Sequence, residues 1–208
     1  MRNLLPLFLD VTGREVLLVG GGRVAAGKLG QLVSAGARVR VVALQVSPDL
    51  ERAARSLEPF VIAISRRAFT PGDLEGVWLV VAAATPEVNR EVAGAAETRR
   101  VFVNAVDDPG NASAFLSGVV RRDGVTIAIS TSGDAPALTA LVREGLDAVM
   151  PQDLDRWIRA ARDQRSIWRR EAVPMEQRKP CLLRALNRLY ETPEPKVPWL
   201  SGPEDSWL

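Results

Sequence analysis

Two stretches of the chain combine residue types and spacings that could do chemistry. The first is a glycine loop, in which an apolar run at residues 16–19 precedes Gly20, Gly22 and Ala25, fitting the pattern G-x-G-x-x-A. In dinucleotide-binding proteins the first glycine permits a tight turn, the second admits the pyrophosphate, and the small third residue lets a helix pack on the strand. The N-terminus of that helix offers N–H donors and a partial positive charge to phosphates.

A glycine turn without any ligand is the alternative interpretation of this loop. The context favours a nucleotide, because a second apolar run at residues 37–43 completes a strand–helix–strand unit. The acidic residue expected to hold a ribose after that second strand is missing, since residues 42–45 are Val-Ala-Leu-Gln. No arginine stands there to accept a 2′-phosphate, so the sequence favours NAD over NADP, with Gln45 or backbone amides contacting the ribose.

The second stretch contains two adjacent carboxylates, Asp107 and Asp108, directly after an apolar run at residues 101–106. If that run is a strand of a parallel sheet, both lie at the edge where such folds bind ligands. The plainer interpretation assigns both to a turn, and we prefer it for Asp108, which precedes Pro109. Asp107 would lie within reach of a nicotinamide, and adjacent carboxylates can raise one pKa into a range useful for acid–base chemistry.

Composition narrows the possible chemistry. The 208 residues contain no histidine, which excludes Ser-His-Asp and Cys-His catalysis and histidine-based metal sites, and the single Cys181 cannot form an internal disulfide. Apolar runs are too short for a membrane span and the N-terminus lacks a signal sequence, so we expect a cytoplasmic protein. Between Arg156 and Arg188, ten basic residues face three acidic ones, which indicates an anionic partner.

The elements that position these residues alternate regularly up to residue 106. Capping pairs such as Ser47 with Pro48 predict helices between apolar runs. Strands are expected at residues 16–19, 37–43, 60–65, 78–84 and 101–106, with helices at 23–33, 50–57 and 88–97 and a short helix or turn at 70–73. This order predicts an α/β fold with a Rossmann-type doubly wound parallel sheet. Its carboxyl edge would gather residues 20–22, 43–45, 83–85 and 104–108.

The pattern changes after residue 112. Residues 115–120 and 125–130 indicate a β-hairpin around an Asp-Gly turn at 121–124, followed by a helix at 137–149. A hairpin with one helix is too small to fold alone, so it must pack on the first domain or on a second copy of the chain, and we expect the second copy. The predicted domains are an NAD-binding Rossmann domain (1–112), a small α+β dimerisation region (113–150), a helical basic region divided by Pro174 (151–191), and a flexible tail (192–208).

Several stretches carry a resemblance in order through residues 4–150. They are Leu-Pro-Leu-Phe-Leu at 5–9, the glycine loop with Lys28, Ala-Ala-Ala-Thr at 82–85, Asn-Ala-Val-Asp-Asp-Pro at 104–109, and Ser-Thr-Ser-Gly at 130–133 with Pro136. In this combination the chain resembles the siroheme synthases, in their precorrin-2 dehydrogenase portion. Two positions depart from the family pattern, since Gly118 stands in place of a proline and Ala135 in place of a serine.

The resemblance implies NAD-dependent oxidation of precorrin-2, a tetrapyrrole with eight carboxylates, to sirohydrochlorin. Some family members also insert ferrous iron, and whether iron or cobalt is a substrate here stays open. Asp107 would be the family's catalytic aspartate, acting as general base or proton carrier. The cofactor-binding residues would be Gly20, Gly22, Arg23, Val24, Leu44, Gln45, Ala83 and Ala84, and the substrate-binding residues would be Asn104, Ser130 and Thr131. No residue is predicted to hold a resident metal.

A hypothesis from another class is an NAD-binding regulator that contacts nucleic acid through its basic helices. Arginines at helical spacing more often form a solvated face, and no helix-turn-helix or aromatic stacking pattern accompanies them. We therefore expect a small-molecule partner, with neither nucleic acid nor a membrane.

Overall fold

The structure is a computed structural model that describes residues 3–57, 60–116 and 118–191. The predicted tail at 192–208 lies outside these ranges. The chain divides into two compact units. The first comprises Met1–Val119 and Ala128–Gly145, and the second comprises Val120–Ile127 and Leu146–Leu208. The division of the chain into four functional parts stays a prediction.

The first unit is built on a five-stranded parallel sheet in the order β3-β2-β1-β4-β5. Its strands are β1 (Glu15–Val19), β2 (Arg38–Val42), β3 (Val61–Ser65), β4 (Leu79–Ala82) and β5 (Phe102–Ala105). β1 pairs with β2 on one side and with β4 on the other, so the strand order reverses between β1 and β4. The predicted α/β class with a doubly wound parallel sheet is confirmed.

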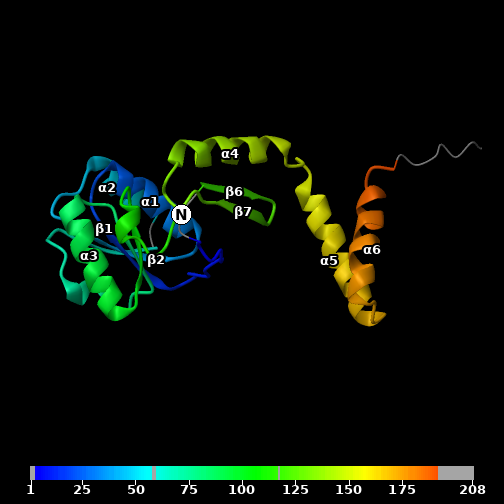
Figure 1. Ribbon diagram of the computed structural model, residues 1–208, viewed down its shortest axis with the longest axis horizontal. Helices are drawn as coiled ribbons and strands as arrows, with labels where there is room; N and C mark the ends of the chain where they lie inside the picture. The colour runs from blue at the N-terminus through cyan, green and yellow to red at the C-terminus, as the bar shows by residue number, and fades with distance from the viewer. Residues whose placement is uncertain (1–2, 58–59, 117, 192–208) are drawn as a thin grey trace, which may run out of the picture. The chain divides into compact units, whose positions relative to one another are not determined.

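Helices cover both faces of this sheet (Figure 1). α1 (Arg23–Ser34) and α2 (Pro48–Ser56) lie on one face and α3 (Pro86–Arg99) on the other. Consecutive β1 residues point to opposite sides, so Leu18 packs with α1 and α2 whereas Leu17 packs with α3. Both are fully buried. Removing such side chains from water contributes about 1.5–3 kcal/mol each, which fixes the strands that carry the site.

Helix boundaries follow local signals in the sequence. The Ser47 hydroxyl accepts a hydrogen bond of 3.3 Å from Leu50 N and Pro48 occupies the first position of α2. α1 ends before Gly36, whose φ of +82° is the left-handed conformation that favours glycine. Two 3₁₀ turns, η1 (Pro71–Leu74) and η2 (Pro109–Asn111), begin at prolines.

The hairpin differs from its prediction. Its strands are β6 (Gly118–Arg122) and β7 (Val125–Ile129), so the first strand begins three residues later than expected and the turn is shorter. Asp123 and Gly124 have φ values of +48° and +88°, which make a two-residue turn that matches the twist of the strands. α4 (Pro136–Val149) follows and buries Thr139, while Leu138, Leu141 and Val149 are exposed.

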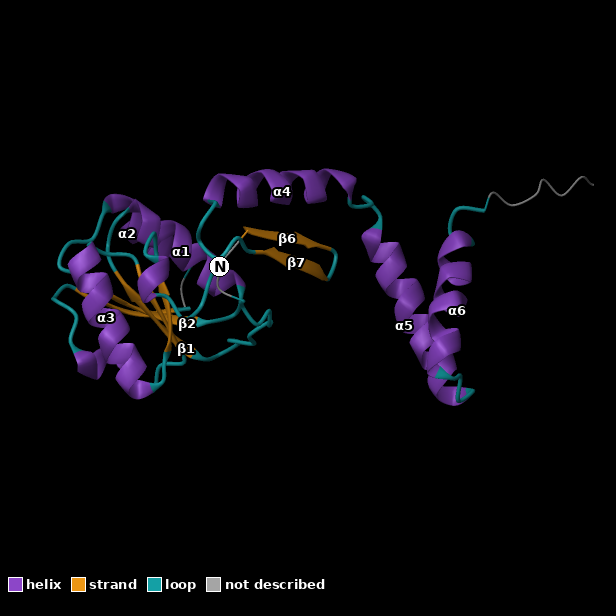
Figure 2. Ribbon diagram, viewed as in Figure 1, coloured by secondary structure: helices purple, strands orange, loops and turns teal. Residues whose placement is uncertain are grey.

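The second unit contains a helical hairpin, seen in Figure 2, of α5 (Leu154–Arg170) and α6 (Met175–Asn187). Pro174 separates them as predicted, and α6 begins at the next residue. Tyr190 ties the hairpin's end to α5, because its hydroxyl accepts a bond of 2.6 Å from Trp157 Nε1 and donates to Asp153 at 3.0 Å. Within the described ranges, no helix is long and apolar enough to cross a membrane.

Candidate functional site

The glycine turn lies where the strand order of the sheet reverses. Ligands of open α/β sheets bind outside the carboxyl ends of the strands at such a point. Gly20 has a φ of +127°, and a Cβ there would collide with the Ala83 carbonyl after β4. A Cβ on Gly21 would collide with the Gln45 carbonyl after β2. The turn is therefore threaded tightly between its two neighbours, and only glycine fits at these two positions.

Gly22 serves a different purpose from the two glycines before it. Its φ of −84° is available to any residue, and a Cβ there would meet no atom within 4 Å. It is the N-cap of α1 without a side-chain cap, and the first helical hydrogen bond runs from Ala26 N to Gly22 O at 3.1 Å. The first-turn N–H groups of a helix have no partners within the helix. Open space above uncapped N–H groups fits the pyrophosphate of a dinucleotide.

A groove of about 490 Å³ opens beside this turn. It runs from the first turn of α1 across the ends of β4 and β5 to the start of α3. Its lining residues are Val24, Ala83, Ala84, Pro86, Asn89, Arg90, Val106, Asp107, Asp108 and Asn111. The structure thus brings four of the predicted site residues together on one groove, namely Val24, Ala83, Ala84 and Asp107.

The remaining predicted cofactor residues lie around the glycine turn rather than in the groove. Arg23 is the exposed first residue of α1, next to Gly22. Leu44 and Gln45 follow β2, which neighbours β1. Leu44 is 72% exposed despite its apolar side chain, so it offers an apolar surface beside the turn. Their contacts with a cofactor stay predictions.

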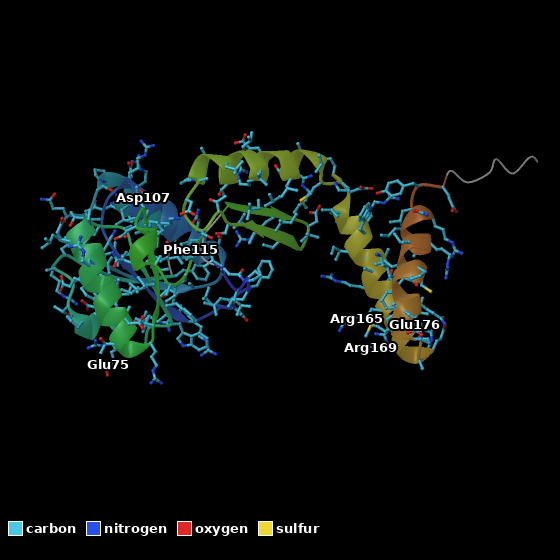
Figure 3. All side chains as sticks on the ribbon, in the orientation of Figure 1. Glu75, Asp107, Phe115, Arg165, Arg169 and Glu176 are labelled. Atoms are coloured by element: carbon cyan, nitrogen blue, oxygen red, sulfur yellow. The ribbon has the colours of Figure 1, made fainter. Side chains whose placement is uncertain are left out.

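Asp107 stands at the end of β5 in an uncommon backbone conformation, and it is labelled in Figure 3. Its φ of +56° lies in the left-handed region, which asparagine and aspartate tolerate better than other non-glycine residues. Its side chain is exposed, and no ion pair or side-chain hydrogen bond of Asp107 occurs within the described part of the chain. A carboxylate held this way on the wall of a groove can exchange a proton with a bound molecule.

Asp108 is a turn residue, as its sequence context indicates. Asn111 Nδ2 donates to Asp108 Oδ2 at 2.8 Å, and Asn111 N donates to the Asp108 carbonyl at 3.2 Å. The Asp108 side chain is therefore engaged in closing η2, whereas the Asp107 side chain faces the groove's solvent.

Lys28 on α1 is electrostatically coupled to Asp107, which the sequence alone did not indicate. Burial lowers the pKa of Lys28 from its usual value, and the negative charge of Asp107 acts in the opposite direction. Lys28 is half-buried, one and a half turns after the glycine loop. The Lys28 cation thus interacts electrostatically with the Asp107 carboxylate without forming an ion pair with it.

The predicted substrate-binding residues have different environments. Asn104 is only 7% exposed, and its Nδ2 donates to the Ala114 carbonyl at 3.0 Å. The Thr131 hydroxyl is used within its own loop, 2.9 Å from Thr139 Oγ1 and 3.2 Å from Ala135 N. Ser130 is exposed and accepts a bond from Ser132 N at 3.1 Å. Of these three residues, Ser130 is the exposed one.

The loop at residues 130–136 lies against the turn after β5. Gly133 has a φ of +86°, and a Cβ there would stand 2.9 Å from Pro109 Cβ and 3.6 Å from Phe115 Cε1. The predicted substrate loop and the turn that carries Asp107 are therefore in direct contact within the first unit.

Two further groove residues were missed from the sequence, Asn89 and Arg90. Asn89 is 3% exposed and bonds to the ends of both β4 and β5, whereas Arg90 is an exposed cation on the groove wall. Their position could have indicated them, because both lie in the first turns of the helix that follows Thr85-Pro86, at the ligand-binding edge of the sheet. Within the described residues, no group of three or more His, Cys, Asp or Glu side chains could hold a metal ion.

Comparisons with known proteins agree with this geometry. Residues 7–118 match the family described as "Putative NAD(P)-binding", and residues 122–148 match the family described as sirohaem biosynthesis protein central. A siroheme synthase of Zymomonas mobilis is 35% identical over 89% of this chain and 39% of its own length. Siroheme synthase 3 of Aeromonas hydrophila is 42% identical over 72% of this chain and 32% of its own length.

The solved structure of SirC, a precorrin-2 dehydrogenase, has the same fold, with a TM-score of 0.63 and 22% identity, covering 87% of this chain and 88% of that one. The fold and the glycine turn define a Rossmann-type NAD(P)-binding protein. More narrowly, the chain belongs to the putative NAD(P)-binding family whose model matches residues 7–118, and it is similar in sequence to siroheme synthases. It spans less than two fifths of the length of the siroheme synthases described here.

Proposed function

We propose that this protein oxidises precorrin-2 to sirohydrochlorin with NAD. The observation that carries the proposal is one groove that runs from Val24, two residues after Gly22 of the dinucleotide turn, to an exposed carboxylate, Asp107. Support comes from the siroheme synthase relatives and from the family match at residues 7–118, a range that includes every residue lining the groove. An NAD-binding turn alone would fit many reactions, whereas Asp107 beside it fits one that moves a hydride and a proton together.

The residues divide the reaction between them. Bound at the α1 N-terminus, NAD would supply the hydride acceptor. Asp107 accepts the proton that leaves the neighbouring position of the tetrapyrrole, so one hydride and one proton are removed for each new double bond. Arg90 on the groove wall attracts the carboxylates of the substrate. The loop at 130–136 lies against the turn after β5, and its exposed Ser130 would contact a substrate bound beside Asp107.

The test is anaerobic turnover of precorrin-2 with NAD, followed by absorbance of the oxidised ring and of NADH. Wild-type protein should produce one NADH for each sirohydrochlorin. Sirohydrochlorin formed at the rate of the protein-free control would refute the proposal.

The cofactor site is tested by Gly22→Val, read by NADH fluorescence titration. The variant should fold, because a Cβ at Gly22 meets nothing within 4 Å, but its side chain would fill the space for the pyrophosphate. We expect NADH affinity to fall about tenfold or more, since a lost contact of about 1.4 kcal/mol is tenfold in Kd. Gly27→Val, in the same helix and equally open, is the matched control. Equal affinities of the two variants would exclude this site.

Homodimerisation is the second part of the proposal. α4 exposes Leu138, Leu141 and Val149 along a helix whose sequence matches the sirohaem central family. An amphipathic helix buries such a face against another element, and a second copy supplies one. Light scattering at micromolar concentration should give twice the 22.6 kDa of one chain. A mass of one chain would refute dimerisation and leave the oxidation intact.

Chelation of ferrous iron by the product is proposed only as a secondary activity. Oxygen ligands compete poorly with imidazole-rich sites for first-row metals, and this chain has no histidine. We expect insertion of ferrous iron into sirohydrochlorin, followed anaerobically by absorption, to be slower than NAD-dependent oxidation. The same assay with cobalt tells which metal the protein prefers. Insertion as fast as oxidation would instead make the protein bifunctional.

A further inference from the structure

Asn89 joins the two strand ends between which the groove opens. It lies in the first turns of α3 and is 3% exposed. Its Oδ1 accepts a hydrogen bond of 3.0 Å from Ala84 N, after β4, and its Nδ2 donates one of 3.5 Å to the Val106 carbonyl, after β5. One side chain therefore bridges two loops that are adjacent in the sheet but more than twenty residues apart in sequence.

The orientation of this amide is fixed by its partners. A backbone N–H can only donate and a backbone carbonyl can only accept, so Oδ1 must face Ala84 and Nδ2 must face Val106. A buried amide also needs partners, because an unsatisfied polar group in the interior is unfavourable. Neither aspartate nor an apolar residue of the same size reproduces both bonds at neutral pH.

The bridge ends at the residue before Asp107. Val106 is held from two sides, since its N–H donates to the Ala82 carbonyl at 2.9 Å and its carbonyl accepts from Asn89. Asp107 follows with its φ of +56°. A non-glycine residue keeps such a conformation only where the surrounding structure determines it. The peptide before Val106 and the peptide after it are therefore both held by hydrogen bonds. Together they fix the direction in which the Asp107 side chain leaves the backbone.

We propose that Asn89 is a positioning residue that holds the Val106–Asp107 turn, and so directs the Asp107 carboxylate into the groove. The proposal rests on the proposed function for its kinetic test, but not for its structural test. Asn89 itself makes no contact with reacting atoms in this account.

The structural test is hydrogen–deuterium exchange of the free protein, without cofactor or substrate. Asn89→Leu keeps the size of the side chain and removes both bonds. We expect faster exchange confined to the peptide that covers residues 103–111. Val92→Ala is the matched control, because Val92 is fully buried on the same helix one turn later, in a hydrophobic cluster that does not include Val106. It should lower the Tm without selective exchange at 103–111.

The kinetic test separates positioning from general stability. Asn89→Leu should lower kcat about tenfold or more, since a misplaced catalytic group affects the chemical step. Val92→Ala should keep the wild-type kcat per folded molecule. A kcat loss in Asn89→Leu that only follows the folded fraction overturns the proposal.

A conservative variant tests the individual bond to Val106. Asn89→Asp keeps the acceptor for Ala84 N, but as a carboxylate it faces the Val106 carbonyl with no proton to donate. Burial raises the pKa of a carboxyl group, so lowering the pH restores the donor. The variant-to-wild-type kcat ratio should therefore rise as pH falls. Asp107, Asp108 and Arg90 line the same groove in both proteins, so the ratio reports only the pH dependence that the introduced carboxylate adds, its interaction with these groups included.

The outcomes distinguish this proposal from the proposed function. Selective exchange at 103–111 in Asn89→Leu, in a wild-type protein that does not oxidise precorrin-2, refutes the function and keeps the positioning. If the wild type oxidises precorrin-2, and Asn89→Leu has unchanged exchange and unchanged kcat, the proposed function is kept and the positioning role is refuted. A flat kcat ratio with pH in Asn89→Asp counts against the bond to Val106.

Discussion

Two acidic turns in the first unit use aspartate in opposite ways. Asp73, in η1, has a side chain only 4% exposed and accepts two hydrogen bonds from Arg67, at 2.8 and 2.5 Å. Thr70 adds bonds to Asp73 Oδ2 from its backbone N–H at 2.8 Å and its hydroxyl at 3.1 Å. These bonds, led by that from Arg67, lower the pKa of Asp73 to about 2.

Asp107 has none of these restraints on its side chain. It is exposed, and only its backbone is held, in the left-handed conformation that follows the Asn89 bridge. Its negative charge acts on Lys28 and raises the pKa of that side chain, although the two form no ion pair. The comparison teaches that a carboxylate saturated with donors stabilises a fold and stays ionised. One fixed only through its backbone keeps its oxygens available for proton exchange.

The largest expected effect comes from Asp107→Asn. Asparagine tolerates the left-handed backbone, so the fold and NADH affinity should be retained, unlike in an alanine variant. Turnover of precorrin-2 should fall about 10²- to 10⁴-fold, the usual contribution of a general acid–base group. Steady-state kinetics and thermal unfolding measure both quantities. Asp108→Asn is the control and should be milder, and wild-type turnover in Asp107→Asn would remove the contrast between the two turns.

Much of this site could be predicted from sequence because its signals are local. The glycine turn and the aspartate after a strand need only their own neighbours in the chain, and the parallel order of strands brings them to one edge. The two hydrogen bonds of Asn89 could not be predicted, because its partners Ala84 and Val106 follow two strands, β4 and β5, whose pairing is tertiary. Asn104 was predicted to bind the substrate, and its hydrogen bond to the Ala114 carbonyl, ten residues later, could not be foreseen from its neighbours in the chain.

The hairpin shows the same limit of local signals. The apolar residues from Phe115 onward predicted a strand there, but Phe115 contacts the loop around Gly133 instead. The Asp-Gly pair located the turn correctly, while the strand's start depended on Gly118. A Cβ on Gly118 would stand 2.9 Å from Thr139 Cγ2 of α4, so this position is set by packing rather than by the strand's own pattern.

The next effect is on stability, from Asp73→Ala. The substitution leaves Arg67 and the Thr70 N–H without their buried acceptor, so the free energy of unfolding should fall by about 2–3 kcal/mol. Urea unfolding measures this loss. Turnover per folded molecule should stay at the wild-type level, opposite to Asp107→Asn. A variant of unchanged stability would show that Asp73 is not the structural member of the pair.

Acid unfolding should report the same carboxylate. The pKa of Asp73 is about 2 in the folded protein, against 3.8 for an aspartate without these partners. Its contribution to the free energy of unfolding is therefore complete above about pH 5 and is lost as pH falls toward 2. The Arg67 side chain is 48% exposed, so screening reduces the contribution to about 1–2 kcal/mol. Urea midpoints between pH 5 and 2 should therefore fall less steeply in Asp73→Ala than in wild type. Parallel curves would contradict this assignment.

The smallest effect is on Lys28, whose pKa is lowered mainly by burial and raised in part by Asp107. Asp107→Asn removes the negative charge that raises this pKa, so the pKa of Lys28 should fall further. The additional fall should be smaller than the lowering that burial causes. A lysine with a lowered pKa in the folded state binds its proton more weakly than in the unfolded chain, so stability rises with pH in the window below 10.5. That rise should begin at a lower pH in Asp107→Asn.

NMR titration of isotope-labelled lysine side chains measures the pKa of Lys28 in both proteins. Asp73→Ala serves as the control and should leave it unchanged, because Asp73 acts on Arg67 and not on Lys28. A pKa of Lys28 that is equal or higher in Asp107→Asn would mean that the two groups do not sense each other. The Asp107 carboxylate would then act without the influence of a cation. Asp107 would differ even more from Asp73, whose carboxylate is paired with Arg67.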